Sequence, residues 1–173
     1  MLKKILAVLC IIICFVLQSS VFCKISFAGI VPNLMIVLTS VFGFMNGERE
    51  GLLTGFFCGL LSDLFFGEFL GFYALLMMYI GFINGKFART FYPEDIKLPI
   101  ALIVTSDLSY GILCYLLLFM LRGRFEFVYY MSHVILPEVL YTVFVTVVLY
   151  PLILLVDRRL STEHRRSAHR IVR

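Results

Sequence analysis

The chain has 173 residues, of which 61% are hydrophobic and only 15% are charged, and its mean hydropathy is +1.00. An average soluble domain carries about 45–50% apolar and about 25% charged residues. A chain of this length cannot bury so much apolar surface in a core of its own. The composition therefore excludes a soluble globular domain and indicates an all-α integral membrane protein, because lipid offers no partner for open backbone groups.

The net charge is +4, and most of the positive charge lies at the two ends of the chain. A basic tail can bind nucleic acid, but beside a membrane span it fits the excess of Lys and Arg on the cytoplasmic side and attraction to anionic lipid. We therefore expect membrane lipid as a partner, no nucleic acid, and a basic cytoplasmic tail over residues 158–173. The terminal basic residues are Lys3, Lys4, Arg158, Arg159, Arg165, Arg166, Arg170 and Arg173.

Six segments are apolar enough to be spans, each of which needs about 20 residues. The first has the outline of a signal peptide, but its apolar run is long and Phe22 before Cys23 does not fit a small-residue cleavage site. We expect it to be retained, so that residues 1–157 form one six-helix transmembrane domain. The segments are residues 4–22, 30–46, 50–66, 70–86, 98–121 and 133–156.

The distribution of Lys and Arg predicts the orientation of these spans. An even number of spans places both termini on one side of the membrane. With the termini in the cytoplasm, twelve Lys and Arg residues lie inside and three lie outside, in agreement with the positive-inside rule. The three outer residues are Lys24, Arg122 and Arg124.

Two prolines mark expected helix starts. Pro32 and Asn33 open the second segment. Pro137 fits the first position of a helix, so that Glu138 would lie in the first turn, where the helix dipole favours a carboxylate. Residues 125–136 would then lie along the outer membrane interface, with their tyrosines as an aromatic anchor.

Glycine recurs at every fourth position of the third segment, at Gly47, Gly51, Gly55 and Gly59, and the next step lands on Asp63. Residues four apart follow one face of a helix, and glycine allows a second helix to approach until the two backbones touch. We expect a helix-packing or partner interface on this face. The spacing leaves open whether the second helix belongs to the same chain.

Asp63 lies near the C-terminal end of its predicted helix, where the helix dipole disfavours an anion. An ionisable side chain at the centre of a membrane helix costs about 2.5–3.5 kcal/mol, so Asp63 needs a partner. Lys24, Arg122 and Arg124 are on the same side by topology, and we expect one of them to pair with it. The alternative is that the carboxylate reaches the membrane interface.

Asp107 falls close to the middle of the fifth segment, beside Thr105, Ser106, Ser109 and Tyr110. We expect its carboxyl group to form hydrogen bonds between helices. An ion or proton relay is the alternative, because an intramembrane carboxylate often serves one.

Residues 31–89 contain, in order, a PNL start, a short polar turn, the pattern G-x-x-x-G-F-x-x-G-L-x-x-D and a glycine-rich entry to the next span. This order and spacing resemble the central signature of the rod shape-determining protein MreD family. The LQSS around Gln18 and the ending PEVLYTVFVTVVLYPLILLVDRRL are also similar to the two ends of that family. The positions that match its motif, as structural or interface residues, are Pro32, Asn33, Gly51, Gly55, Gly59 and Asp63.

The resemblance implies a non-enzymatic scaffold of the elongation (rod) complex, a multi-pass protein of the bacterial cytoplasmic membrane that helps to maintain cell shape. Its implied partners are MreC, the actin-like MreB and the membrane-bound peptidoglycan synthases, and it implies no cofactor and no catalytic residues. The sequence itself contains no catalytic triad, phosphate loop or metal-ligand cluster. The alternatives are the substrate-binding subunit of a small-solute, vitamin-type transporter and an intramembrane enzyme, and self-association into a homo-oligomer is left open.

Overall fold

The structure is a computed structural model that describes residues 2–25, 29–67, 69–87, 97–119 and 126–148. These residues are almost entirely helical, which confirms the all-α class for the described part of the chain. The basic tail residues Arg158, Arg159, Arg165 and Arg166 lie outside these ranges, as do the last eight residues of the sixth predicted span.

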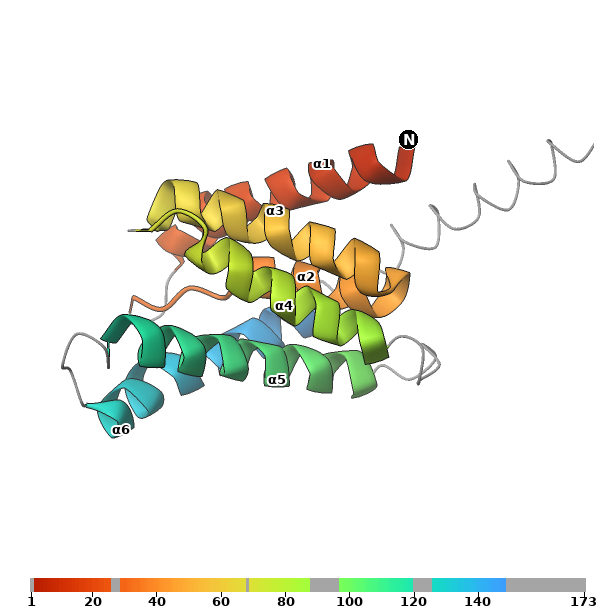
Figure 1. Ribbon diagram of the computed structural model, residues 1–173. Coiled ribbons are helices and arrows are strands. Elements are labelled where there is room, and N and C mark those ends of the chain that lie inside the picture. Colours follow the sequence, from red (N-terminus) through yellow and green to blue (C-terminus); the bar gives the residue numbers. More distant parts are fainter. Residues whose placement is uncertain (1, 26–28, 68, 88–96, 120–125, 149–173) are drawn as a thin grey trace, which may run out of the picture.

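The helices follow one another with short connections (Figure 1). Three of them end or begin in π-helical turns, labelled η, in which the backbone hydrogen bonds span one residue more than in an α-helix. The elements are α1 Leu2–Val16, η1 Leu17–Phe22, α2 Leu34–Asn46, α3 Glu48–Phe66, α4 Phe72–Phe87, α5 Lys97–Cys114, η2 Tyr115–Phe119, α6 Phe127–Tyr130 and η4 Met131–Ile135, after which the last helix continues over residues 136–148.

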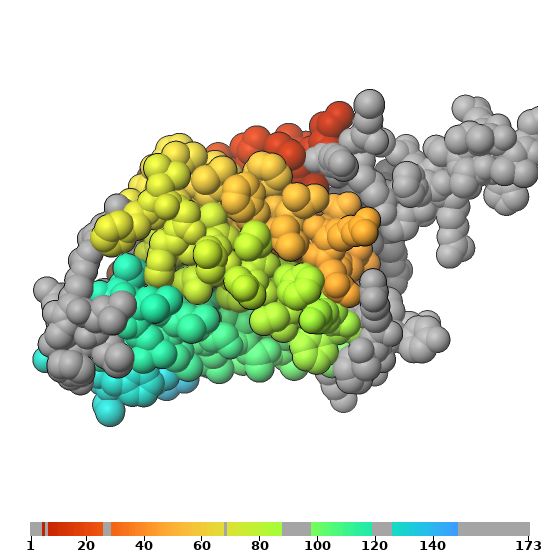
Figure 2. Space-filling model, in the orientation of Figure 1, coloured from red at the N-terminus to blue at the C-terminus, as the bar shows by residue number. Residues whose placement is uncertain are grey.

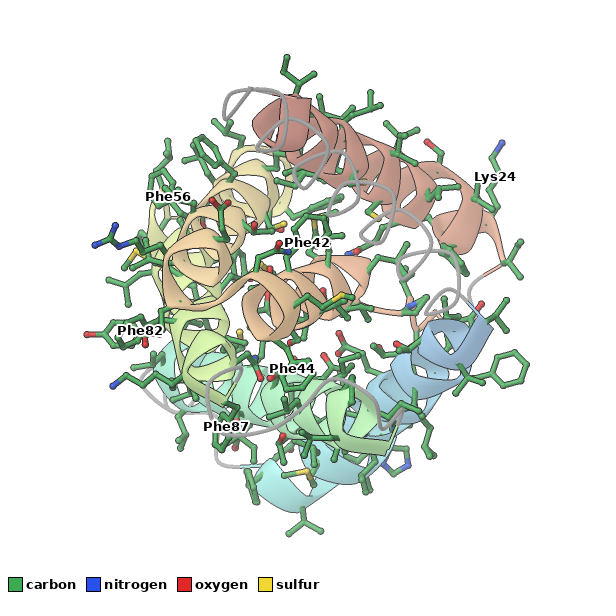
Figure 3. The ribbon with its side chains drawn as sticks, turned by 90° about the vertical axis from the view of Figure 1, so that its right-hand side faces the viewer. Lys24, Phe42, Phe44, Phe56, Phe82 and Phe87 are labelled. Carbon is green, nitrogen blue, oxygen red and sulfur yellow. The ribbon has the colours of Figure 1, made fainter. Side chains whose placement is uncertain are left out.

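Helix α2 occupies the centre of the bundle. Every residue from Leu34 to Phe44 is buried, and α2 packs against α1, α3, α4 and α5. Figure 3, which looks along the helices, shows α2 surrounded by the others, with Phe42 and Phe44 inside the bundle. A helix that is apolar on all sides is buried in a protein core or spans a membrane, and α2 lies in the core of this bundle.

Within the part of the chain that the structure describes, two helices are long and apolar enough to cross a membrane, Leu98–Leu118 and Phe127–Val148. Three further apolar helices are shorter, with 13 to 16 residues: Ala7–Phe22, Leu34–Asn46 and Phe72–Phe87. Each of the six predicted segments contains a helix. The number of spans and the location of both termini stay predictions.

The start of the last helix was predicted wrongly. The helix begins at Phe127 and runs through Pro137 without a break, so Glu138 does not lie in a first turn and residues 127–136 are not a separate interfacial segment. Proline lacks an N–H group and its ring crowds the carbonyl group four residues earlier. The π-helical turn η4 directly before Leu136 widens the backbone there, which lets Pro137 stand inside the helix.

Helices α3 and α4 form an antiparallel hairpin and have the most extensive contact of any two elements. Figure 2 shows the side chains of α4 filling the space between α3 and α5 on one face of the molecule. The hairpin is joined to α2 through Gly47 alone, whose φ of 91° lies in the left-handed region that favours glycine. Helices α2, α3 and α4 are therefore one compact unit.

Candidate functional site: the glycine contact, the Asp63 cap and the polar cluster

The glycines of α3 meet the backbone of α4 directly. A Cβ atom added at Gly51, Gly55 or Gly59 would overlap backbone atoms of α4, more closely than real Cβ atoms approach any neighbour. Along this face the two helices are thus in backbone contact, and any larger residue would push them apart. The facing pairs are Gly51 with Gly81, Gly55 with Met77, and Gly59 with Ala74.

Glycines on the neighbouring helices complete this contact, and the sequence analysis did not identify them. Gly81 and Gly85 lie one turn apart on α4, and a Cβ atom at Gly85 would lie 2.5 Å from Cα of Glu48. Gly43 of α2 faces the same place, because a Cβ atom there would lie 2.7 Å from the carbonyl oxygen of Gly81. Three helices therefore meet where a single methyl group would not fit.

Gly47 has a different role from the three glycines that follow it. It lies in the turn between α2 and α3, and a Cβ atom added there would meet no atom within 4 Å. Its N–H donates a hydrogen bond to the carbonyl oxygen of Gly43, 2.8 Å away, and its own carbonyl oxygen accepts one from the N–H of Gly51. The regular four-residue spacing therefore combines a turn glycine with packing glycines.

The partner of the glycine face is a helix of the same chain. Helix α4 covers Gly51, Gly55 and Gly59, so this face of α3 is not presented to another protein. The opposite face of α3 carries large apolar side chains, and Phe56 points away from the bundle (Figure 3). Contacts of α3 with a partner would therefore use that opposite face.

Gly55→Leu is expected to separate α3 from α4. The new side chain would collide with the backbone at Met77, which cannot rotate away as a side chain can. We expect the free energy of unfolding to fall by about 3 kcal/mol, or the bundle to fail to assemble, since overpacking of a tight site typically costs about 1–3 kcal/mol and the obstacle here is backbone. Thermal unfolding of the purified protein in detergent measures the change.

The control for this substitution is Phe56→Leu on the same turn of α3. Phe56 is 38% exposed, so its replacement by a smaller apolar residue should change the free energy of unfolding by less than about 1.5 kcal/mol. Equal stability of the Gly55→Leu and Phe56→Leu proteins would contradict the backbone contact.

Asp63 caps the start of α4. Its carboxylate is 3% exposed and accepts three backbone hydrogen bonds: Oδ2 from the N–H groups of Gly71 and Ala74, at 3.0 and 2.9 Å, and Oδ1 from the N–H of Tyr73, at 2.8 Å. The first N–H groups of a helix have no partner within the helix, and the positive end of the helix dipole favours an anion there. The carboxylate that α3 disfavours is thus stabilised by α4.

This geometry gives Asp63 backbone partners that the sequence analysis did not consider. The predicted interaction was with Lys24, Arg122 or Arg124, but the hydrogen bonds of Asp63 go to the backbone, and Lys24 is exposed and points away from the bundle (Figure 3). Arg122 and Arg124 lie outside the described residues. The carboxylate is buried within the bundle, and its depth in the membrane stays a prediction.

Two glycines shape the loop that Asp63 holds. Gly71 has a φ of 98°, a conformation that L side chains rarely adopt, and this turns its N–H towards the carboxylate. A Cβ atom at Gly67 would lie 2.7 Å from the carbonyl oxygen of Asp63, so only glycine lets the chain leave α3 so close to its last turn. Asp63, Gly67 and Gly71 therefore act together to close the hairpin between α3 and α4.

Asp63→Ala is expected to lower the free energy of unfolding by at least about 2 kcal/mol, because three N–H groups lose their acceptor. Asp63→Asn should give an intermediate loss, since its amide NH₂ group cannot accept the hydrogen bonds that one carboxylate oxygen accepts. Chemical unfolding measures the loss in free energy of unfolding for each variant. The control is Leu64→Val, at an exposed neighbouring residue. Wild-type stability of Asp63→Ala would show that the cap contributes nothing.

A buried amide joins α4 to α2 and α5. Asn84 is 2% exposed, and the two hydrogens of its Nδ2 are shared among three acceptors: Oγ of Ser40 at 3.2 Å, Oγ of Ser106 at 2.8 Å and the carbonyl oxygen of Ile80 at 3.0 Å. In lipid such interhelical hydrogen bonds contribute about 0.6 kcal/mol on average. The sequence analysis did not single out Asn84, although its place between Gly81 and Gly85 puts it beside the glycine contact.

The start of α2 carries a second polar contact. Asn33 is the N-cap residue of α2, and its side-chain oxygen accepts a hydrogen bond from the N–H of Ile36. Its own N–H donates to Oγ1 of Thr142 on the last helix, at 3.0 Å. The N–H of Met35 donates to the side chain of Gln18 in η1. Three segments far apart in sequence therefore meet at the residue that follows Pro32.

Asp107 belongs to the same polar cluster. It is 2% exposed, its carboxyl group interacts with the side chain of Thr142, and its Oδ2 atom makes no hydrogen bond within the described residues. Glu138 lies one turn before Thr142 on the last helix, and its carboxyl group interacts with the side chain of Asn33 and electrostatically with Asp107. The structure thus brings together Asn33, Asp107 and Glu138, which the sequence analysis had treated separately. Asp107 thus brings a buried carboxyl group of α5 against the last helix, and its interhelical hydrogen bond stays a prediction.

The described ranges contain no group of three or more His, Cys, Asp or Glu side chains placed to hold a metal ion. The geometry instead consists of helix contacts, caps and buried hydrogen bonds. The family model for the rod shape-determining protein MreD matches residues 1–159. The chain belongs to the MreD family. It matches no curated protein and no solved structure.

Family membership gives the chain a role in rod-shape determination and fits the membrane setting indicated by its apolar helices. The match extends over all the described elements, and so over the glycine contact, the Asp63 cap and the polar cluster. In this MreD-family protein, these three features hold the helices of the bundle together.

Proposed function

We propose that this MreD-family protein is a non-enzymatic scaffold of the rod complex, which crosses the bacterial cytoplasmic membrane six times with both termini in the cytoplasm. In this role it holds MreC, MreB and the peptidoglycan synthases in one assembly. The family match over residues 1–159 is the observation that carries the proposal. The basic tail over residues 158–173 would face MreB or anionic lipid.

The architecture suits a scaffold protein that must keep its shape while several partners bind to it. Helices α2, α3 and α4 touch through backbone atoms. Such contacts cannot adjust by rotation of side chains, so the helices are held in one arrangement. The Asp63 cap fixes one end of the hairpin, and Asn84 ties α4 to α2 and α5. A bundle built in this way presents its outer faces in a constant arrangement.

The proposal is tested by replacing the resident MreD protein of a rod-shaped bacterium with this chain. We expect the wild-type chain to maintain rod shape and to co-purify with MreC. Gly59→Leu should lose both properties, because it forces α3 away from Ala74. Cell width and the amount of MreC recovered from detergent-solubilised membranes are the measurements.

The matched control is Phe57→Leu, at a residue of α3 that is 47% exposed and keeps an apolar side chain. It should preserve rod shape if the glycine contact is what matters. A correctly inserted wild-type chain that neither recovers MreC nor supports rod shape would overturn the scaffold role. Full function of a stable Gly59→Leu protein would overturn the link between the glycine contact and that role.

A further inference from the structure

The helices on the outside of the bundle differ in length, and neighbouring helices end at different heights on the outer, non-cytoplasmic side. We propose that the exposed faces of α3 and α4 bind a locally thinned bilayer, whose hydrocarbon region is about 24 Å thick there. The partner of this surface is thus lipid rather than protein. The inference rests on the membrane crossing included in the proposed function.

The helices on two sides of the bundle have different lengths. Helix α4 has 16 residues and is about 24 Å long, and three charged residues at the start of α3 shorten its apolar part to a similar length. The apolar helices Leu98–Leu118 and Phe127–Val148 have 21 and 22 residues, or about 31 and 33 Å. A hydrocarbon region is about 30 Å thick, so only the two longer helices match it. Figure 3 shows α3 and α4 on the side of α2 opposite the last helix.

One ring contact fixes the heights of α4 and α5 relative to each other. The rings of Tyr73, near the start of α4, and Tyr110 of α5 have their centroids 6.1 Å apart. The two helices run in opposite directions (Figure 1). Counting along both helices from this contact puts Lys86, in the last turn of α4, at the height of Lys97, the first residue of α5. The cytoplasmic ends of the two helices therefore coincide.

The outer ends of the same helices do not coincide. Helix α4 begins at Phe72, directly before the ring contact, whereas α5 and η2 continue past Tyr110 to Phe119, for about 13 Å. The start of the last helix accompanies them, because the rings of Tyr115 and Phe127 have their centroids 5.3 Å apart. The ends of α5 and of the last helix thus extend together beyond the hairpin of α3 and α4.

A flat bilayer fits neither of these two outer heights. At the height of the longer helices, its hydrocarbon would cover the non-helical loop between α3 and α4, whose sequence carries Glu68. Irregular backbone and charge facing lipid are both strongly unfavourable. At the height of the loop, it would leave apolar side chains of the longer helices in water, since Leu113, Leu117 and Val128 are 37%, 43% and 80% exposed. A bilayer that is thinner at α3 and α4 avoids both costs.

Polar atoms on α4 agree with a thin hydrocarbon region. Tyr79, in the middle of α4, is 55% exposed, and tyrosine side chains prefer the membrane interface. The ammonium group of Lys86 lies over the ring of Phe82, 4.7 Å from its centroid, and so is directed back along the helix towards its middle. A thinned hydrocarbon region brings both groups close to water.

The test uses the absence of Trp from the chain, which makes one introduced Trp a unique fluorescent reporter of depth. Leu75→Trp on α4 and Ser109→Trp on α5 are at exposed positions of nearly equal height, because each lies within two residues of the ring contact. The purified full-length protein is placed in nanodiscs of dioleoylphosphatidylcholine. Quenching by lipids brominated near the headgroup is compared with quenching by lipids brominated deep in the acyl chain.

We expect the ratio of shallow to deep quenching to lie above one for Leu75→Trp and below one for Ser109→Trp. The control pair is Ile83→Trp on α4 and Ala101→Trp on α5, both at exposed positions near the coinciding cytoplasmic ends, and it should give equal ratios. A wild-type Tm of each variant shows that the fold is retained. Hydrogen exchange at the N–H of Leu70, in the loop of the unsubstituted protein, is a second measurement and should be rapid.

Equal ratios for Leu75→Trp and Ser109→Trp would show a flat bilayer and overturn the proposal. So would a Leu75→Trp reporter that neither brominated lipid nor aqueous iodide reaches, because a protein neighbour would then cover α4. Slow exchange at Leu70 would place the loop in hydrocarbon and contradict the thinning. If brominated lipid quenched none of the four reporters, the membrane crossing of the proposed function would itself be wrong.

Discussion

Direct backbone contact between α3 and α4 is the constraint on which the rest of the bundle depends. Because Gly51 and Gly81 bring the two helices together, Gly43 of α2 can reach the same point, and α2 becomes enclosed. Enclosure removes the apolar surface of α2 from its surroundings and brings its N-terminal end beside α5 and the last helix. At that end the N–H of Asn33 donates a hydrogen bond to Thr142 of the last helix.

Hydrogen bonds of polar groups hold the helices in the arrangement that the glycine contact brings about. Asp63 closes the hairpin at one end of α4, and Asn84 joins α4 to two neighbours near the other end. In lipid, apolar packing gives little preference for one helix neighbour over another, and hydrogen bonds supply part of that preference. The rigid core that results fits the scaffold role proposed for this MreD-family protein.

The sequence predicted the helical class, the start of α2 and the face of α3 that carries glycine, because each depends on local spacing or composition. It did not predict which helix covers Gly51 and Gly55, since a four-residue spacing describes one face and not its neighbour. The partner of Asp63 was missed because only charged side chains were considered, whereas its partners are the backbone N–H groups of Gly71, Tyr73 and Ala74. Likewise Glu138 was misplaced because proline suggested a helix start, and the π-helical turn before it left no sign in the sequence.

Amide hydrogen exchange across the start of α4 tests the account most directly. The N–H groups of Tyr73 and Ala74 lie in the first turn of a helix, where they would exchange rapidly without an acceptor. The account predicts that they are protected in the wild-type protein and lose that protection in Asp63→Ala. The N–H of Ile36, capped by Asn33, should stay protected in both proteins. Rapid exchange at Tyr73 and Ala74 in the wild-type protein, or unchanged protection in the variant, would contradict it.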